Sequence, residues 1–312
     1  MGITQKRHES KWARLIADEL DSQGIKSCTD LSLKQVSTFA IGGPCDLSVF
    51  PKNANELIDA IDLAKRSNIK FEVVGRASNI LFSDNGYSGM IIFTSQMKQI
   101  IHKSSGEIFV EAGANLTNAS VKALGWGLSG LEFACGIPGS CAGAVYMNAG
   151  AYGGEISDIL EYSEYYDALQ NRIKVLCKAD HSFSYRHSIY QEHKDMIILG
   201  AGLRLSKAPV EDIKSKMDEY TQKRKASQPH EYPNVGSIFK RPAVGFAAKM
   251  IDECGLKGLT VGGAQVSEKH AGFIVNRGNA TSRDVLALIE IIRERVLSQF
   301  GVELECEVRI IK

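Results

Sequence analysis

The feature that most constrains this chain is a glycine-rich stretch at residues 125–154, near the middle of the 312-residue sequence. The stretch holds nine of the 29 glycines and a single charged residue, Glu132. A flexible linker would be polar and rich in serine, whereas this stretch contains the apolar runs LEFA, IPG and AVYM. Because glycine allows close approach of the backbone, the pattern predicts ordered chain packed tightly against another element.

Two segments have the composition of loops that bind anions. GIPGSCAGAVYMNAGAYGGE (136–155) strings together small residues, and VGRASNILFSDNG (74–86) leads from a buried strand into a small-residue loop. Successive backbone N–H groups in such loops can form a nest for a diphosphate. Each segment taken alone could equally be a set of structural turns.

Two common nucleotide motifs are excluded. GWGLSG (125–130) satisfies GxGxxG, but it lacks the preceding strand and the following helix that a Rossmann fingerprint requires. The sequence contains no GxxxxGK[ST], which excludes a P-loop.

Composition narrows the class of protein further. The 37 basic and 36 acidic residues leave a net charge of +1, so we expect neither nucleic acid nor an anionic membrane as a partner. No apolar run approaches the roughly 20 residues of a membrane helix, and the N-terminus is too charged for a signal peptide. Seven cysteines without a CxxC pair favour buried, reduced thiols in the cytoplasm, with no disulfide framework and no metal site.

The periodicity of apolar residues predicts mixed helices and strands. A β-α-β unit is expected from strand 47–51, helix 53–68, strand 71–75 and strand 90–94. The sequence also indicates a domain boundary near 206–208 and a long alternating strand at 303–311. Further helices are predicted at 5–24, 116–124, 210–225 and 282–300, and further strands at 108–112, 162–166, 172–177 and 196–205.

Eight segments in a fixed order resemble the UDP-N-acetylenolpyruvoylglucosamine reductase (MurB) family. They span residues 37–311 and read STFAIGGP, VGRASNILFSDNG, GLSGLEFACGIPGS, MNAGAYGGE, FSYRHS, QPHEYPNVGSIFKRP, GGAQVSEKHAGFIVN and ELECEVRII. The resemblance implies an α+β fold. An N-terminal helix and lead-in (1–36) would precede a two-part FAD-binding domain of the vanillyl-alcohol-oxidase (PCMH) type (37–206). A smaller α/β substrate-binding domain (207–312) would follow, with its closing strand packed back near the active site.

The resemblance also implies an activity. Family members reduce UDP-N-acetylglucosamine enolpyruvate to UDP-N-acetylmuramate with NADPH, through bound FAD, in peptidoglycan precursor synthesis. We expect a cytoplasmic monomer. Its FAD should be bound non-covalently, because neither glycine-rich segment contains a histidine that could attach the flavin. The short link between strand 196–205 and helix 210–225 leaves no room for the tyrosine-bearing lid of some members, so the chain resembles the type II form.

Three residues match the catalytic motifs of the family. Arg186 would clamp the substrate carboxylate and stabilise the enolate, because a guanidinium is always charged and forks onto carboxylates. Ser237 would protonate the carbon, and Glu307 would lie with Arg186. Alternation places Glu303, Glu305 and Glu307 on one face, so the choice of Glu307 rests on its matching position before Val308-Arg309.

The resemblance assigns two further sets of residues. The FAD-binding set is Gly75, Arg76, Ala77, Ser78, Asn79, Gly136, Ile137, Pro138, Gly139, Ser140, Gly143, Asn148 and Gly150. The substrate-binding set is Tyr185, Tyr232, Lys240, Arg241 and Gln265.

The sequence departs from the family in both flavin loops. Arg76-Ala77 stands where a glycine pair is usual, and Cys141-Ala142 stands where Val-Gly is common. Two alternatives stay open: a flavin oxidase acting on an alcohol or hydroxy acid, and a non-catalytic protein that binds flavin or a nucleotide sugar. The C-terminal set Ser237, Lys240, Arg241 and Glu307 disfavours the oxidase, and the presence of all three catalytic residues disfavours the binding protein.

Overall fold

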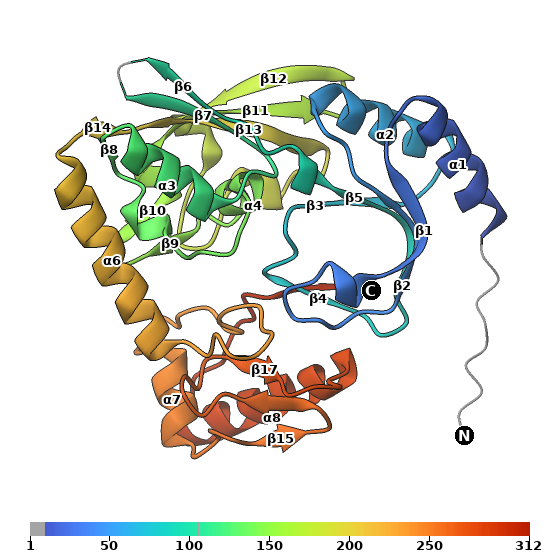
Figure 1. The fold of residues 1–312 in the computed structure, drawn as a ribbon. Helices are drawn as coiled ribbons and strands as arrows, with labels where there is room; N and C mark the ends of the chain where they lie inside the picture. Colours follow the sequence, from blue (N-terminus) through green and yellow to red (C-terminus); the bar gives the residue numbers. More distant parts are fainter. Residues whose placement is uncertain (1–9, 105) are drawn as a thin grey trace.

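The computed structural model describes residues 10–104 and 106–312, which form three parts around a shared centre (Figure 1). The first part is a four-stranded sheet in the order β1-β2-β5-β3. Both β2 and β3 run parallel to β5, which confirms the predicted β-α-β unit. The bounds are α1 (Lys11–Ser22), β1 (Ser27–Ser32), β2 (Pro44–Val49), α2 (Ala54–Arg66), β3 (Phe71–Val74), β4 (Ile80–Phe82) and β5 (Tyr87–Phe93).

The two N-terminal helices are both present, and a local signal explains the start of the second. The Asn53 side chain accepts a hydrogen bond from the Glu56 N–H at 3.0 Å and so caps α2 near the predicted start of this helix. Helix α1 begins at Lys11, and residues 5–9 of the predicted helix lie outside the described residues.

The second part is a five-stranded antiparallel sheet in the order β12-β11-β13-β7-β6. Short helices pack against it, and α4 contacts the central strand β13. The bounds are β6 (Ile100–Ser104), β7 (Glu107–Glu111), α3 (Leu116–Gly125), α4 (Cys141–Tyr146), α5 (Ile156–Ile159), β11 (Leu160–Asp167), β12 (Arg172–Cys177) and β13 (Met196–Arg204).

The glycine-rich stretch is ordered and closely packed, as predicted. It contains α4 and the small hairpin of β9 (Gly150–Ala151) and β10 (Gly154–Glu155). A Cβ at Gly154 would lie 2.8 Å from the Phe133 ring, so only glycine fits there. Strand β8 (Leu128–Ser129) pairs with β14 (Ser206–Lys207) at the predicted domain boundary.

The third part is a small α/β unit that α6 (Val210–Ser227) connects to the second part (Figure 1). Helix α8 (Ser282–Phe300) has the predicted bounds, because the Thr281–Asp284 capping box begins it and Gly301, at φ 66°, ends it. The remaining elements are α7 (Ala247–Glu253), β15 (Thr260–Val261), β16 (Ala264–Val266) and β17 (Ile274–Asn276).

The predicted closing strand at 303–311 is wrong in extent. Strand β18 spans only Arg309–Ile311, because its parallel partner β4 offers three residues and residue Cys306 makes only an isolated bridge with Phe239. The C-terminus thus leaves the third part and ends against the first (Figure 1).

The cysteines differ in part from expectation. All seven are free, and Cys45 and Cys141 are buried, but Cys28 and Cys177 are exposed. Burial raises the pKa of the Cys45 thiol to about 11 and that of Cys141 to about 12, which keeps both protonated at neutral pH. Within residues 10–104 and 106–312, no helix is both long enough and apolar enough to cross a bilayer.

Candidate active site

A cavity of about 760 Å³ lies where the three parts meet. Its walls come from the loop after β3, from the glycine-rich stretch, and from the segment that carries Ser237. Binding sites for cofactors are commonly concave spaces of this size at domain interfaces. All predicted FAD-binding residues except Asn148 line this cavity.

The first wall is the loop from Gly75 to Asn79. Ala77 is buried with φ at +49°, a left-handed conformation that glycine adopts more easily. The departure from the usual glycine therefore places an alanine where the backbone favours glycine, and Arg76, which lines the cavity, is exposed. The Asn79 side chain donates to the Glu307 carbonyl at 3.0 Å, which ties this loop to the end of the chain.

The second wall is the segment from Gly136 to Gly143. The Ser140 hydroxyl accepts the Gly143 N–H at 3.3 Å and caps α4. A Cβ at Gly75 would lie 2.0 Å from this hydroxyl oxygen, so the two glycine-rich loops touch each other. Their contact leaves a backbone cradle that a side chain would fill, which fits the diphosphate of FAD.

Asn148 lies behind the cavity wall, although the sequence places it in the FAD-binding set. Its side chain is fully buried and donates to the Glu155 carboxylate at 2.9 Å and to the Ser184 carbonyl at 3.1 Å. It therefore holds the glycine-rich hairpin against the segment that precedes Arg186.

Arg224, on α6, is a cavity residue that the sequence did not reveal. Its Nη1 donates to Gln228 at 3.1 Å, while its Nε is buried and has no hydrogen-bond partner among residues 10–104 and 106–312. Burial lowers the pKa of the guanidinium, although it stays charged. Its Cδ would lie 3.1 Å from a Cβ at Gly136, so the side chain lies against the second wall. An anionic group bound there would accept a hydrogen bond from the Arg224 Nε–H.

The sequence signal for Arg224 is the basic run at 223–225, which is typical of a solvated helix end. Burial of the middle residue depends on the packing of α6 against the glycine-rich stretch. The run alone does not show it.

The predicted catalytic pair meets on the cavity wall. Arg186 Nε donates to Glu307 Oε1 at 2.9 Å, and Arg186 Nη2 donates to the Gly150 carbonyl at 3.1 Å. The two side chains are only 20% and 16% exposed. Burial raises the pKa of Glu307 above its ordinary value, while the positive charges of Arg186 and Lys240 oppose that rise.

Ser237 reaches the same cavity from the third part of the molecule. It follows Gly236, at φ +81°, and forms a bridge with Phe273. The Glu307 N–H donates to the Ile238 carbonyl at 2.8 Å, so the segments that carry Ser237 and Glu307 lie side by side. The structure thus brings Arg186, Ser237 and Glu307 together from distant parts of the sequence.

Three of the predicted substrate-binding residues gather beside Arg186. The Arg186 guanidinium lies 5.0 Å from the centre of the Tyr185 ring, and the Tyr185 hydroxyl accepts the Arg241 backbone N–H at 3.2 Å. Lys240 Nζ pairs with Glu305 at 2.6 Å.

None of the five residues of the substrate-binding set is among those that line the main cavity, and two of them make their contacts away from Arg186. The Arg277 guanidinium lies over the Tyr232 ring, 4.2 Å from the ring centre. The Gln265 side chain donates within its own hairpin, to the Gly258 carbonyl at 3.2 Å and to Thr260 Oγ1 at 3.1 Å, and the structure does not bring it to the cavity.

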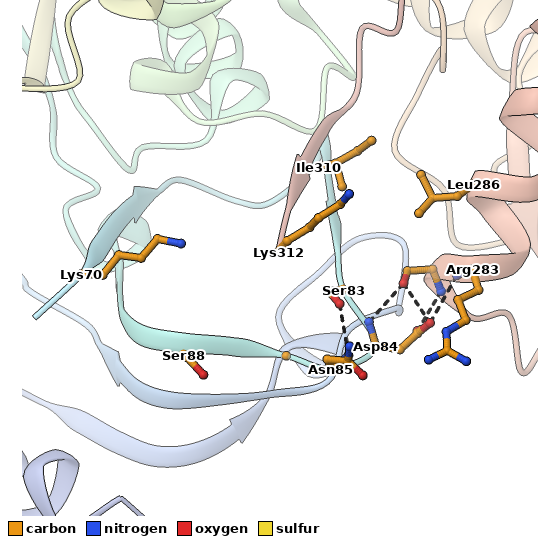
Figure 2. A pocket seen from close by; sticks show the side chains of 11 residues that line it. Lys70, Ser83, Asp84, Asn85, Ser88, Arg283, Leu286, Ile310 and Lys312 are labelled. Carbon is orange, nitrogen blue, oxygen red and sulfur yellow. Dashed lines mark hydrogen bonds between the residues drawn. The ribbon is translucent and has the colours of Figure 1, made fainter.

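A second cavity, of about 400 Å³, lies at the joint between the first part and α8. Figure 2 shows Asp84 directed at the first turn of α8, where its carboxylate accepts the backbone N–H groups of Ser282 and Arg283. This contact satisfies the helix N-terminus, and none of the predicted site residues lines the space.

The fold and the main cavity define a FAD-binding oxidoreductase with a charged site at the junction with a second domain. Residues 45–172 match the FAD binding domain family, and residues 228–311 match the family of the UDP-N-acetylenolpyruvoylglucosamine reductase C-terminal domain. The C-terminal match favours a reductase of this kind over an alcohol oxidase.

Individual relatives agree along nearly the whole chain. The sequence is 47% identical over 294 residues to a UDP-N-acetylenolpyruvoylglucosamine reductase of Caldicellulosiruptor saccharolyticus, covering 94% of each chain. It is 45% identical over 279 residues to that of Caldanaerobacter subterraneus subsp. tengcongensis, covering 89% of this chain and 91% of the relative. The crystal structure of MurB from Thermus caldophilus superposes with a TM-score of 0.78 at 33% identity, covering 92% of this chain and 99% of that one. The chain belongs to the UDP-N-acetylenolpyruvoylglucosamine reductase family.

Proposed function

We propose that this chain catalyses the NADPH-dependent, FAD-mediated reduction of UDP-N-acetylglucosamine enolpyruvate to UDP-N-acetylmuramate. The observation that carries the proposal is the Arg186–Glu307 pair, 2.9 Å apart, on the wall of the cavity that both glycine-rich loops line. Ser237 on the same cavity completes the set that reduction of an enolpyruvyl group requires. The two loops at 75–79 and 136–143 would hold FAD, which would pass a hydride from NADPH to the substrate.

Arg186 has the chemistry to hold the substrate carboxylate and to stabilise charge that develops on the enolate. Its bonds to Glu307 and to the Gly150 carbonyl fix the guanidinium in advance. Its backbone lies at φ +57°, and non-glycine residues in this conformation are often part of a functional site. Fixed orientation matters because a preorganised charge needs no rearrangement during the reaction.

Ser237 is the proposed donor of the proton to the α-carbon. A serine hydroxyl is a weak acid, so the developing negative charge beside it must assist the transfer. Glu307 holds Arg186 by accepting its Nε–H, and burial raises the pKa of this carboxyl while Arg186 and Lys240 oppose the rise.

The phosphate groups of FAD and of the substrate require separate cations in this proposal. Arg224 faces the glycine-rich loops and serves the cofactor, while Lys240 and Arg241 beside Tyr185 serve the nucleotide sugar. The protein is proposed to act in the cytoplasm, in peptidoglycan precursor synthesis, and as a monomer whose single chain supplies all three catalytic residues. The balanced net charge of +1 supports small molecules, rather than nucleic acid or membrane, as its partners.

The visible absorption spectrum of the purified protein tests the proposal. Flavin bands should bleach with NADPH under anaerobic conditions and return when UDP-N-acetylglucosamine enolpyruvate is added. A colourless protein that FAD cannot reconstitute would contradict the function and favour a non-catalytic binding protein. A coloured protein that oxidises alcohols but does not reduce the enolpyruvate would favour the oxidase alternative.

The variant Ser237→Ala tests the assigned proton donor. Reduction of the flavin by NADPH should stay within about twofold of the wild-type rate, while reoxidation by the substrate should slow by about 10²–10⁴-fold. Ser22→Ala, which changes an exposed serine of α1, is the matched control. Equal slowing of both half-reactions would show that Ser237 has a structural role instead.

A further inference from the structure

We propose that Phe246 is a positioning residue that holds the Arg241 guanidinium, free of any carboxylate, for the diphosphate of the nucleotide-sugar substrate. This inference rests on the proposed function and assigns to the same site a residue outside the catalytic and binding sets. It follows from an exposed aromatic ring, a neighbouring cation and their place beside the catalytic pair.

The first observation is the ring itself. Phe246 is 55% exposed although it begins α7, where its carbonyl accepts the N–H groups of Lys249 and Met250. Burial of a phenylalanine ring is favourable by roughly 1.5–3 kcal/mol, so an exposed ring on a rigid element forgoes that gain. The Arg241 guanidinium lies 4.2 Å from the centre of this ring.

The second observation is the lack of a neutralising partner. Across the described parts of the chain, Lys240 pairs with Glu305 and Arg186 pairs with Glu307, but Arg241 forms no ion pair. A carboxylate would compete with a phosphate for the guanidinium. An aromatic face attracts the cation and limits its motion, yet it leaves the N–H groups at the edge available.

The third observation is location. The backbone N–H of Arg241 donates to the Tyr185 hydroxyl at 3.2 Å. The Arg186 guanidinium lies 5.0 Å from the centre of the Tyr185 ring. Phe246, Arg241, Tyr185 and Arg186 are therefore connected, because the Arg241 side chain lies over the Phe246 ring and the Arg241 backbone binds the Tyr185 hydroxyl. The connected residues run from the start of α7 to Arg186, which lines the main cavity.

Phe246→Leu removes the π face while keeping an apolar side chain. We expect the KM for UDP-N-acetylglucosamine enolpyruvate to rise about two- to fivefold, as the loss of one exposed cation–π contact implies. The kcat and the rate of flavin reduction by NADPH should not change, and Phe246→Tyr should restore the KM. Val244→Ala, an exposed apolar residue of the same loop, is the control.

A double-mutant cycle with Arg241→Ala gives the decisive readout. Arg241→Ala should raise the KM by at least about tenfold, as the loss of a charged hydrogen bond implies, and Phe246→Leu should have no further effect in that background. Additive effects, an unchanged KM in Phe246→Leu, or a lowered kcat with constant KM would each overturn the proposal. Failure of the wild-type holoenzyme to reduce the enolpyruvate would instead overturn the proposed function.

Discussion

At the scale of single residues, the Glu307 carboxyl group can act in two ways, by holding Arg186 or by transferring a proton. Its Oε1 accepts the Arg186 Nε–H, and its burial favours the protonated form. The amide of Glu307→Gln keeps an oxygen for Arg186 but cannot ionise. If holding Arg186 is the main role, we expect Glu307→Gln to slow reoxidation of the flavin by substrate about tenfold, and Glu307→Ala to slow it about 100-fold or more.

Stopped-flow measurement of the two half-reactions checks this order. NADPH should reduce the flavin of both variants at close to the wild-type rate, which serves as the internal control. Equal losses for the glutamine and alanine variants would contradict a holding role and favour proton transfer by Glu307.

His181 lies outside the active site, and its titration should lower the free energy of unfolding at acid pH. It is fully buried, its Nδ1 donates to the Cys177 carbonyl at 2.9 Å, and its Nε2 accepts from Ser163 at 2.8 Å. Burial lowers the pKa of His181 below the ordinary 6.5. The unfolded chain therefore binds a proton at a higher pH than the folded chain, so stability falls as pH decreases below about 6.5.

Urea denaturation at saturating FAD, repeated from pH 7.5 to pH 5, measures this effect. The free energy of unfolding of the wild type should fall by up to about 1.4 kcal/mol per pH unit more steeply than that of His181→Asn. His270, whose pKa burial also lowers, contributes equally to both proteins. Identical slopes would show that His181 titrates as it does in water.

At the scale of elements, the sequence predicts best where local signals agree. Helix α8 has the predicted bounds because a capping box, an apolar face and a terminal glycine all lie within its own sequence. Strand β18 is shorter than predicted because its length depends on β4, a partner more than 200 residues away. Alternation in ELECEVRII does not reveal how many residues that partner offers.

The contact between the two glycine-rich loops makes an element-scale prediction. Gly75→Ala would place a methyl group 2.0 Å from Ser140 Oγ, which must rotate and abandon its cap on α4. We expect a loss of about 1 kcal/mol in unfolding free energy and weaker FAD binding. Ser140→Gly alone should cost only a few tenths of a kcal/mol, because glycine is tolerated at an N-cap.

The double variant Gly75→Ala/Ser140→Gly isolates the contact. It should recover most of the FAD affinity, measured by flavin fluorescence during titration of the apoprotein. Without such recovery, the methyl group would be acting on the flavin directly and not through Ser140.

At the scale of the whole molecule, the site could be predicted only through its motifs. Arg186, Ser237 and Glu307 are far apart in sequence, and nothing in local periodicity brings them together. The structure joins them because the chain leaves the third part and returns to β4. Gln265 and Asn148 show the limit of motif matching, since each lies in a matching segment while its side chain bonds away from the cavity.

The C-terminal return predicts that a very short truncation will affect catalysis. Ile311 is 6% exposed and its carbonyl accepts the Ser83 N–H at 2.9 Å, so β18 anchors the segment that carries Glu307. Deletion of residues 310–312 should lower the unfolding free energy by about 2 kcal/mol through lost burial of Ile311. Reoxidation of the flavin by substrate should slow at least about tenfold, because Glu307 and its partner Arg186 lose their fixed positions. Flavin reduction by NADPH should stay within about twofold, and deletion of Lys312 alone is the control. If both half-reactions slow equally, or if the truncated protein releases FAD, β18 stabilises the whole cavity and does not specifically position Glu307.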